Sequence, residues 1–276
     1  MKKVLQIIQH VLRHSYLLKA VEYCRYLKRV LQCKRRNRAF RRDHPDFKLP
    51  PQHLAYDAYA SPDWFYYKKT GLQIAQDIVE LLLKYSYDIT SIKILEWGCG
   101  PGRVIRHFPK LLGPNARVYG TDYNEETIDW AQENIDGVEF MKNDLKPPLL
   151  FGNNTFDFVC ALSVLTHLSE ESCLQWIKEI ERVLKNDGML CFTTNSDIIA
   201  EILLSHEKKL YDTKGFYCRR KIQEGKKMFN AFHSRQYVRR TLIRDFELLQ
   251  HTTSGPFQFI PTQDTWLVRK KKRGEA

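Results

Sequence analysis

Four residues in the segment "ILEWGCGPGRV" have types and a spacing that suit the binding of a small cofactor. Glu96, Gly98, Gly100 and Gly102 alternate with other residues directly after a short apolar run. Glycines permit the backbone angles of a tight turn and let a ligand approach without meeting a Cβ. A dinucleotide-binding turn would read G-x-G-x-x-G. Because a carboxylate at the turn would repel a pyrophosphate, the pattern favours a ligand with a cationic amine.

Two further carboxylates extend this expected site. Asp122 ends the apolar segment "RVYGTD", where a carboxylate can accept hydrogen bonds from two ribose hydroxyls. The segment "EFMKNDL" offers Asp144 to the exocyclic amine of adenine and Leu145 to the edge of the ring. Together these residues indicate a ligand with an amine, a ribose and an adenine, and without phosphates.

The elements that must position these residues alternate between strands and helices. Strands are expected at 93–96, 117–121, 138–141, 156–161 and 189–193, and helices at 103–112, 124–134 and 170–184. This alternation predicts a parallel sheet with helices on both faces. The segments "DFELLQHTT" and "DTWLVRKKK" predict a terminal antiparallel pair. An insertion at about 195–246 is too long for one crossover, and we expect it to be a substrate lid over the carboxyl ends of the strands.

Charge divides the chain further. Residues 1–45 carry 13 Lys or Arg against Glu22 and Asp43, whereas the net charge of the whole chain is +12. Apolar and basic residues at helical spacing predict a basic amphipathic arm over 1–45. A Pro-rich linker at 46–60, a main domain at 61–268 and a basic tail at 269–276 are expected to follow. Three interpretations of the arm stay open. It could bind an anionic membrane surface, it could bind a nucleic acid, or it could pack on its own domain or in a dimer while its charged groups stay solvated.

Four motifs in order resemble those of the class I S-adenosylmethionine-dependent methyltransferases. They are "ILEWGCGPGRV", "YGTDYNEETIDWA", "NNTFDFVCALSVLTHLSEE" and "WIKEIERVLKNDGMLCFTT". The resemblance implies a Rossmann-like, doubly wound α/β sheet of seven strands with an antiparallel last strand, and S-adenosyl-L-methionine as cofactor. The cofactor-binding residues that we expect are Glu96, Gly98, Gly100, Gly102, Asp122, Tyr123, Asp144, Leu145 and Ser163. The segments "NAFHS" and "PTQDTWLV" are also similar to bacterial methyltransferases encoded with surface-polysaccharide or natural-product glycosylation enzymes.

The reaction expected from this resemblance is metal-independent O-methylation of a small-molecule or glycan hydroxyl. The segment "CALSVLTHL" after the fourth strand lacks the Asn/Asp-Pro-Pro-aromatic motif used for the exocyclic amines of bases. It also lacks the acidic cluster of a magnesium-dependent enzyme. The alternatives are an RNA or protein methyltransferase that uses the basic arm, and a nonenzymatic module that binds S-adenosylmethionine.

A hydroxyl acceptor needs a general base, and two histidines are candidates. His167 follows the fourth strand, and His233 lies in the expected lid. Either could take a proton near neutral pH, although a histidine at a helix start can also bind only the backbone. Asp264 could polarise a histidine or simply sit in a turn.

The cysteines and the apolar segments of the sequence indicate the cellular compartment. Seven cysteines form no C-x-x-C pair, which indicates a reducing compartment and no structural metal. Polar residues interrupt the apolar part of "MKKVLQIIQHVLRHSYLLKA", and no apolar run reaches the ~20 residues of a membrane span. We therefore expect a cytoplasmic protein, with peripheral contact at the inner face of the membrane through the arm.

Overall fold

The computed structural model describes residues 17–85, 89–195, 197–219, 222–253 and 262–271. The chain divides into two compact units, 1–69 and 70–276. The helix α4 (Trp64–Tyr85) crosses the boundary between them. The first 16 residues of the expected arm and the last five of the expected tail lie outside the described residues. None of the described helices has the length and apolar character needed to cross a membrane.

The first unit consists of α2 (Leu17–Asp43), α3 (Gln52–Tyr59) and the start of α4. Its small core contains Phe40, Trp64 and Tyr67, whose rings are almost completely buried. The Trp64 and Tyr67 rings meet edge to face with centroids 6.3 Å apart, a favourable geometry for aromatic pairs. The expected helical arm is therefore confirmed for α2.

The connection after α2 differs from the expected Pro-rich linker, because residues 46–60 contain the helix α3. Asn37 fixes the return of the chain: its Nδ2 donates to the carbonyl of Pro62, and its Oδ1 accepts from the backbone N–H of Trp64. The helix α4 then begins at Trp64, three residues into the main domain expected at 61–268. At the N-terminus of α4, the side-chain amide of Asn37 thus accepts from a backbone N–H that has no partner within the helix.

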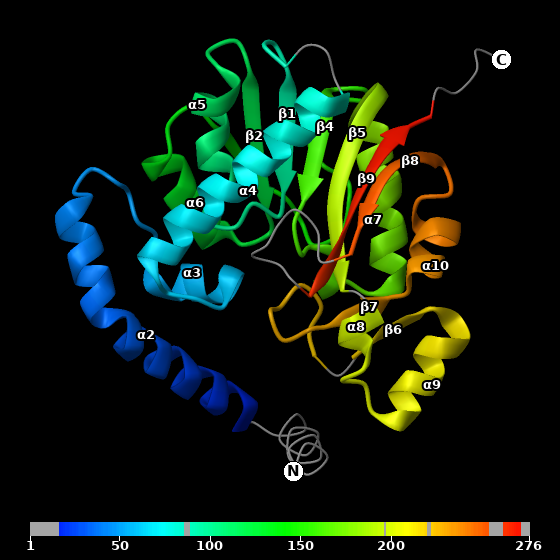
Figure 1. Ribbon diagram of the computed structural model, residues 1–276, viewed down its shortest axis with the longest axis horizontal. Coiled ribbons are helices and arrows are strands. Elements are labelled where there is room, and N and C mark those ends of the chain that lie inside the picture. The colour runs from blue at the N-terminus through cyan, green and yellow to red at the C-terminus, as the bar shows by residue number, and fades with distance from the viewer. Residues whose placement is uncertain (1–16, 86–88, 196, 220–221, 254–261, 272–276) are drawn as a thin grey trace. The chain divides into compact units, whose positions relative to one another are not determined.

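The second unit contains one seven-stranded sheet in the order β3-β2-β1-β4-β5-β9-β8 (Figure 1). Its strands are β1 (Lys93–Trp97), β2 (Arg117–Asp122), β3 (Glu139–Lys142), β4 (Phe156–Ala161), β5 (Leu184–Asn195), β8 (Phe246–Thr252) and β9 (Gln263–Lys270). The first five strands pair in parallel, and β9 is antiparallel to both β5 and β8. The predicted doubly wound sheet with an antiparallel last strand is confirmed.

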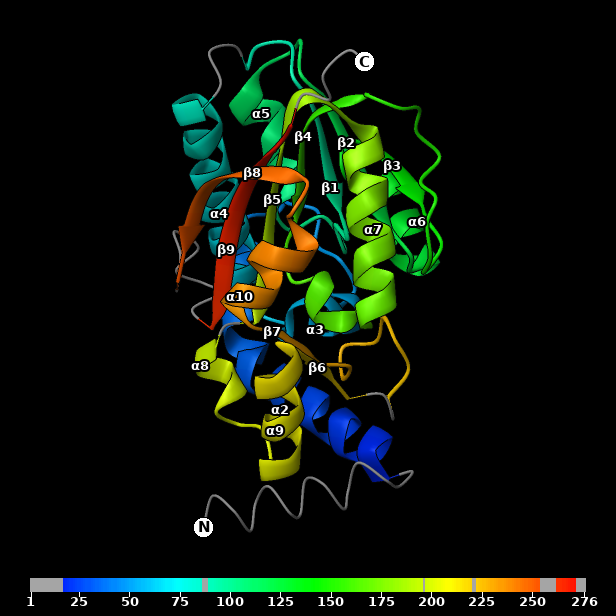
Figure 2. The same ribbon diagram turned by 90° about the vertical axis from the view of Figure 1, so that its right-hand side faces the viewer.

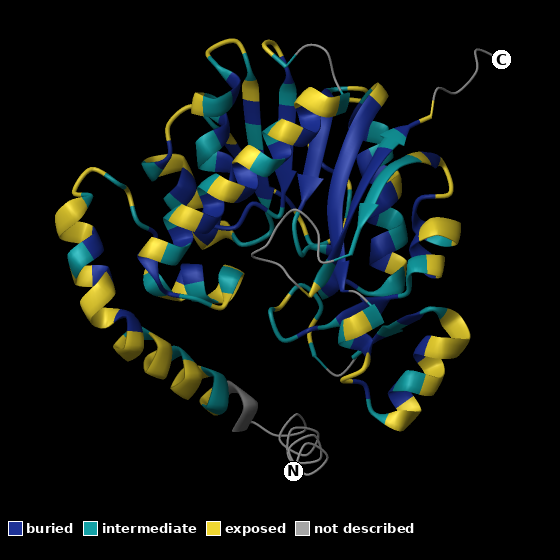
Figure 3. Cartoon of the chain, in the orientation of Figure 1, coloured by how far each residue is buried: buried dark blue, intermediate teal, exposed yellow. Residues whose placement is uncertain are grey.

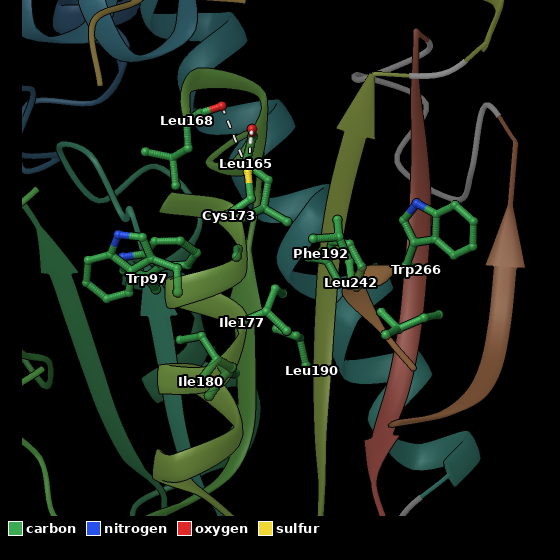
Figure 4. Close-up of a cluster of buried hydrophobic side chains, with 14 of the residues drawn as sticks. Trp97, Leu165, Leu168, Cys173, Ile177, Ile180, Leu190, Phe192, Leu242 and Trp266 are labelled. Carbon is green, nitrogen blue, oxygen red and sulfur yellow. Dashed lines mark hydrogen bonds between the residues drawn. The ribbon is translucent and has the colours of Figure 1, made fainter. Parts of the chain in front are cut away.

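Helices cover both faces of this sheet, as Figures 1 and 2 show. The helices of the crossovers are α5 (Phe108–Leu112), α6 (Glu125–Asn134) and α7 (Glu170–Val183). On one face, Ile74 and Ile78 of α4 pack with α5 and α6. On the other face, α7 packs its apolar stripe on β4 and β5, and Figure 4 shows Ile177 beside Leu190 and Phe192.

The α7 helix begins where its sequence predicts. The hydroxyl of Ser169 caps the helix by accepting from the backbone N–H of Ser172, and Glu170 and Glu171 occupy the first turn. A cap and early carboxylates both stabilise a helix N-terminus. By contrast, the helix expected over 103–112 is shorter, because the residues up to Val104 belong to the glycine turn and α5 follows a single 3-10 turn.

The insertion between β5 and β8 lies beyond the carboxyl ends of β4 and β5 (Figure 1). It contains α8 (Asp197–Ala200), α9 (Ser205–Lys214), β6 (Phe216–Cys218), β7 (Ala231–His233) and α10 (Arg235–Tyr237). The strands β6 and β7 form a separate antiparallel pair, which the sequence interpretation did not include. The insertion therefore lies where a lid is expected, and it contains a small sheet of its own.

Candidate active site

The glycine turn lies between the end of β1 and the start of α5. Gly98, Gly100 and Gly102 have φ values of +75°, +53° and +71°, which side chains other than glycine rarely adopt. A Cβ on Gly98 would lie 2.4 Å from Cγ2 of Val164, and one on Gly102 would lie 2.3 Å from Cδ1 of Ile135. The turn needs glycine at these positions because of its positive φ values and because Val164 and Ile135 pack against Gly98 and Gly102.

Asp122 at the end of β2 lies directly beside this turn. Its Oδ2 accepts from the backbone N–H of Gly100, and its Oδ1 accepts from that of Asn124, each at 2.9 Å. These bonds fix the carboxylate between the turn and the start of α6. Each carboxylate oxygen can accept more than one hydrogen bond, so the position suits the two ribose hydroxyls expected from the sequence.

Glu96 is the buried carboxylate under the turn. Its side chain is 4% exposed, and its Oε2 has no hydrogen-bond partner among the residues that the structure describes. Burial raises the pKa of Glu96 to about 8, against the opposing effect of the Arg103 guanidinium. A buried acceptor without a partner costs free energy until a donor arrives. A cationic amine would supply that donor, so Glu96 fits the amino group of S-adenosylmethionine.

Arg103 links the turn to α4 through a residue that the sequence interpretation missed. A Cβ on Gly71 would lie 1.9 Å from the carbonyl oxygen of Arg103. The Arg103 guanidinium also donates to the hydroxyl of Thr70 at 3.2 Å. Glycine at position 71 thus allows α4 to touch the turn backbone. A lone glycine inside a helix gives no signal for this contact, because only the fold brings position 103 beside it.

The end of β3 and the residue after β2 form the side expected to hold the adenosine. Asp144 is exposed, and the carbonyl of Leu145 accepts from Nε1 of Trp176 at 3.0 Å. The hydroxyl of Tyr123 donates to the carbonyl of Gly225 in the insertion at 2.8 Å. A Cβ on Gly225 would lie 2.7 Å from Cδ1 of Leu145. The insertion therefore contacts Tyr123 and Leu145, both predicted cofactor residues.

Asn143 is a second residue that the sequence interpretation missed. Its Nδ2 donates to the carbonyl of Asp144 at 2.6 Å, which fixes the orientation of the amide. Its buried Oδ1 has no hydrogen-bond partner within the described ranges. This oxygen can accept from an exocyclic amine, the same role that we expected for Asp144.

His167 lies in the 3-10 turn Leu165–His167 after β4, and Val164 at the start of this turn packs against Gly98. Its Nδ1 is 2.8 Å from the carbonyl oxygen of Phe229 in the insertion. Because a carbonyl oxygen only accepts, Nδ1 carries the proton, and Nε2 of the neutral ring carries the lone pair. This is the tautomer that a general base needs. The backbone carbonyl of His167 also accepts from the N–H of Gly225.

His233, the second predicted base, is in a different environment. Its side chain is 1% exposed, and its Nε2 lies 3.6 Å from Sγ of Cys173. Its ring meets that of Phe216 edge to face, and burial lowers its pKa to about 3. Such a ring binds a proton weakly at neutral pH. The geometry favours a packing role for His233, and it favours His167 as the base. Both assignments remain predictions.

A polar group at the ends of β4, β5 and β9 was not foreseen as a unit. Ser163 donates its backbone N–H to Oγ1 of Thr193, and both hydroxyls donate to Oε1 of Gln263, at 2.9 and 2.7 Å. Ser163 has a φ of +62°, which is strained for a residue with a side chain. Since Oε1 receives both hydroxyls, the two N–H donors of the Gln263 amide face elsewhere.

Asp264, the other polar residue at the start of β9, does contact a histidine. Its Oδ2 lies 2.9 Å from Nε2 of His251 and 3.1 Å from Nε of Arg235. The His251 ring stacks on Trp266 with centroids 3.9 Å apart. Neighbouring strands lie ~4.8 Å apart, so β8 is about three strand spacings from β4. The Asp264 cluster therefore joins Arg235 of the insertion to His251 of β8, and no hydrogen bond or ion pair between Asp264 and His167 is found among the described residues.

Comparison with protein families places a methyltransferase domain model on residues 94–188. This range contains β1 to β4 with the glycine turn, Asp122 and His167. Residues 94–188 are therefore similar to a methyltransferase domain, and the sheet topology described above is that expected of the S-adenosylmethionine-dependent class. S-adenosylmethionine is the cofactor of such domains, and the glycine turn, the buried Glu96 and Asp122 fit its methionine and ribose parts.

Curated relatives match this methyltransferase domain over part of their length. An uncharacterized methyltransferase of Schizosaccharomyces pombe is 33% identical over 36% of this chain and 38% of its own. A malonyl-[acyl-carrier protein] O-methyltransferase of Bacillus cereus is 28% identical over 51% of this chain and 48% of its own. A tRNA N(3)-methylcytidine methyltransferase of Schizosaccharomyces pombe is 30% identical over 40% of this chain and 47% of its own. The chain thus spans less than half the length of these relatives.

Solved structures share the fold of the methyltransferase domain at low sequence identity. A methyltransferase from Mesorhizobium loti has a TM-score of 0.54 and 16% identity, covering 69% of this chain and 96% of that one. The magnesium protoporphyrin IX methyltransferase of Synechocystis PCC 6803, with bound SAH, has a TM-score of 0.52 and 17% identity over 89% and 99%. These similarities establish the fold.

Proposed function

We propose that this protein is a metal-independent O-methyltransferase that acts on a hydroxyl of a small molecule or glycan. One observation carries the proposal: His167 lies in the 3-10 turn that follows β4, with Nδ1 hydrogen-bonded to the Phe229 carbonyl, so that Nε2 is the basic nitrogen of this tautomer. A positioned histidine of this kind can take the proton of an attacking hydroxyl. The O-methyltransferase of Bacillus cereus supports the reaction class by similarity.

In this mechanism the cofactor supplies a methyl group that its sulfonium makes electrophilic. Glu96 would hold the amine of the cofactor, Asp122 would hold its ribose, and the glycine turn would lie against its methionine part. The acceptor hydroxyl loses its proton to Nε2 of His167 as its oxygen bonds to the methyl carbon and the carbon–sulfur bond breaks. In this proposal the Gln263 amide donates a hydrogen bond to a second oxygen of the acceptor and so orients it.

The first test is calorimetric titration with S-adenosylmethionine and S-adenosylhomocysteine, with NAD as a control. Binding of the two sulfur compounds in the micromolar range, without binding of NAD, is the expected result. An acceptor screen with radiolabelled methyl groups then tests the reaction. Cofactor binding without transfer to any hydroxyl acceptor would favour a nonenzymatic binding module instead.

The base is tested with the variant His167→Asn. Asparagine keeps an N–H donor for the Phe229 carbonyl but has no basic nitrogen, so turnover should fall by ~10²-fold or more at unchanged cofactor affinity. The exposed His206 provides the control variant His206→Ala, which should keep full activity. If His233→Ala lowers turnover as much as His167→Asn without loss of folding, His167 is not the sole base.

A second candidate acceptor is RNA. The observation in its favour is the ten Lys or Arg residues of α2, against Glu22 and Asp43, together with the similarity to a tRNA methyltransferase. Methyl transfer to bulk tRNA, measured beside transfer to sugar and phenol hydroxyls, discriminates between the two. Transfer to tRNA that stops when residues 1–45 are deleted would replace the hydroxyl proposal.

A further inference from the structure

The helix α2 has two faces of different character. One face belongs to the core of the first unit: Cys33, Asn37 and Phe40 are buried there. A neighbouring face carries three large side chains that are exposed, with Tyr23 at 61%, Leu27 at 42% and Leu31 at 69%. Spacings of four residues align these three side chains along the helix. Exposed apolar residues that share one face, unlike scattered ones, indicate an interaction surface.

The same face continues toward the C-terminus of α2 with basic residues. Lys34, Arg38 and Arg41 follow Leu31 at spacings of three and four residues, and all three are exposed. None of the three forms an ion pair with any residue that the structure describes. We name the combined surface the α2 stripe, which consists of Tyr23, Leu27, Leu31, Lys34, Arg38 and Arg41. Figure 3 shows most of α2 as exposed.

The other charges of α2 add to the positive potential of the α2 stripe. Acidic groups pair with Arg25, Arg36 and Arg42, through Glu22, Asp63 and Asp43 respectively. The helix nevertheless carries ten Lys or Arg against two acidic residues. Two copies of such a helix would repel each other when placed face to face, so a second copy of this chain is a poor partner.

Two kinds of anionic partner are compatible with the positive charge of α2, and the exposed apolar residues discriminate between them. A nucleic acid would contact the basic residues through its phosphates, but it would leave Leu27 and Leu31 in water. A membrane surface with anionic lipids offers both phosphate headgroups for the basic half and an apolar layer for the other half. The α2 stripe therefore matches a lipid surface more completely than a nucleic acid.

We propose that the α2 stripe binds the protein peripherally to anionic phospholipid membranes. Tyr23, Leu27 and Leu31 enter the headgroup boundary, and Lys34, Arg38 and Arg41 contact the phosphates. Because the apolar residues of the α2 stripe precede its basic ones, the helix lies tilted, with its N-terminal end deeper. This inference does not depend on the methyl acceptor.

The test is flotation of the full chain with phosphatidylcholine vesicles, with and without phosphatidylglycerol. The protein should float with the mixed vesicles, float weakly with phosphatidylcholine alone, and lose most binding at ~1 M salt, where the Debye length is ~3 Å. The variant Leu27→Ser/Leu31→Ser should lose at least ~10-fold in vesicle partitioning. Equal binding to both vesicle types would overturn the proposal.

Matched controls separate the α2 stripe from general surface properties. Leu83 and Leu150 are exposed at 60% and 82% in the second unit, so Leu83→Ser/Leu150→Ser should leave flotation unchanged. Lys34→Gln/Arg38→Gln/Arg41→Gln should abolish it, whereas the equal charge change Lys110→Gln/Arg117→Gln/Lys178→Gln should not. Loss in both charge variants would assign the binding to net charge and overturn the proposal.

Other occupants of the α2 stripe would give different results. Binding to single-stranded RNA that depends on Lys34, Arg38 and Arg41 but not on Leu27 and Leu31, without flotation, would assign the surface to nucleic acid. A dimer in light scattering that Leu27→Ser/Leu31→Ser dissociates, without flotation, would assign it to a second copy. Thermal melting and affinity for S-adenosylhomocysteine should match the wild type in every α2 variant. Loss of either would show a folding defect, whereas failure of the hydroxyl-methylation proposal would leave flotation unaffected.

Discussion

Two halves of one sheet edge are built in different ways. At the ends of β1, β2 and β3, short segments of sequence carry the predicted cofactor residues other than Ser163, and the backbone conformation of the glycine turn shapes this half. At the ends of β4, β5 and β9, the group of Ser163, Thr193 and Gln263 joins residues 70 and 100 positions apart. A half made from local segments can be recognised in the sequence, whereas a half made from distant residues requires the fold.

The largest expected effect tests the backbone half. Gly98→Ala places a Cβ 2.4 Å from Val164 at a φ of +75°, where strain alone costs ~1–2 kcal/mol. With the clash added, affinity for S-adenosylhomocysteine should fall by ~100-fold or more, equivalent to ~2.7 kcal/mol, in calorimetric titration. Gly152→Ala is the control, because its nearest contact would be 3.7 Å. Wild-type affinity in Gly98→Ala would show that the turn tolerates a side chain.

Asp122→Ala tests the same half through a side chain. It removes the acceptor for the Gly100 and Asn124 backbone N–H groups as well as for the ribose, so affinity for S-adenosylhomocysteine should drop by ~1.5–3 kcal/mol. The measurement is the same titration, with adenosine as a second ligand. An affinity for adenosine that does not change in Asp122→Ala would place the ribose elsewhere.

Glu96 makes the cofactor half sensitive to pH. Folding raises the pKa of Glu96 from an ordinary 4.5 to about 8, so the folded state holds a proton that the unfolded chain has lost. The free energy of unfolding of the cofactor-free protein should therefore decrease as pH rises between these values, by up to ~1.4 kcal/mol per pH unit. Urea denaturation of the wild type and Glu96→Gln measures this contribution.

In Glu96→Gln the decrease of the free energy of unfolding with pH should lack the contribution of Glu96, which is up to ~1.4 kcal/mol per pH unit. Saturating S-adenosylmethionine should also reduce the slope in the wild type, since its amine stabilises the ionised carboxylate. Identical slopes in the wild type and the variant would mean that Glu96 is ionised in the folded protein.

The smallest expected effect belongs to the acceptor half. Gln263→Met keeps the size of the side chain but removes the amide donors, so kcat/KM for the acceptor should fall by ~10-fold, about 1.4 kcal/mol. The affinity for S-adenosylhomocysteine should stay within ~2-fold of the wild type. If the variant loses cofactor affinity instead, Gln263 supports the cofactor half and the two halves are not separate.

The sequence indicates the elements of the proposed cofactor half because each of them follows from local rules. Glycines with positive φ, a carboxylate at the end of β2 and the alternation of strands and helices are visible without a fold. The antiparallel β9 was also predicted, from two strand-like segments joined by a loop. The register that places Gln263 beside Asn195 of β5 is set by packing of the whole sheet, and no short pattern indicates it.

Three other findings required the structure for physical reasons. The burial of His233 depends on Phe216 and Cys173, which the insertion brings to it from distant positions. The contact of Gly71 with Arg103 depends on the path of α4. The helix α3 forms within a Pro-rich segment because prolines at positions 50 and 51 precede it, where a missing N–H costs no helical hydrogen bond.

The contacts of the Gly225 turn have a kinetic consequence. This turn receives a hydrogen bond from Tyr123 and donates one to the carbonyl of His167, so it joins the two halves of the edge. If adenosine lies beside Tyr123 and Leu145, exchange of the spent cofactor requires these bonds to open. We expect a long residence time for S-adenosylhomocysteine, ordered binding with the cofactor first, and product dissociation as the slow step of each turnover.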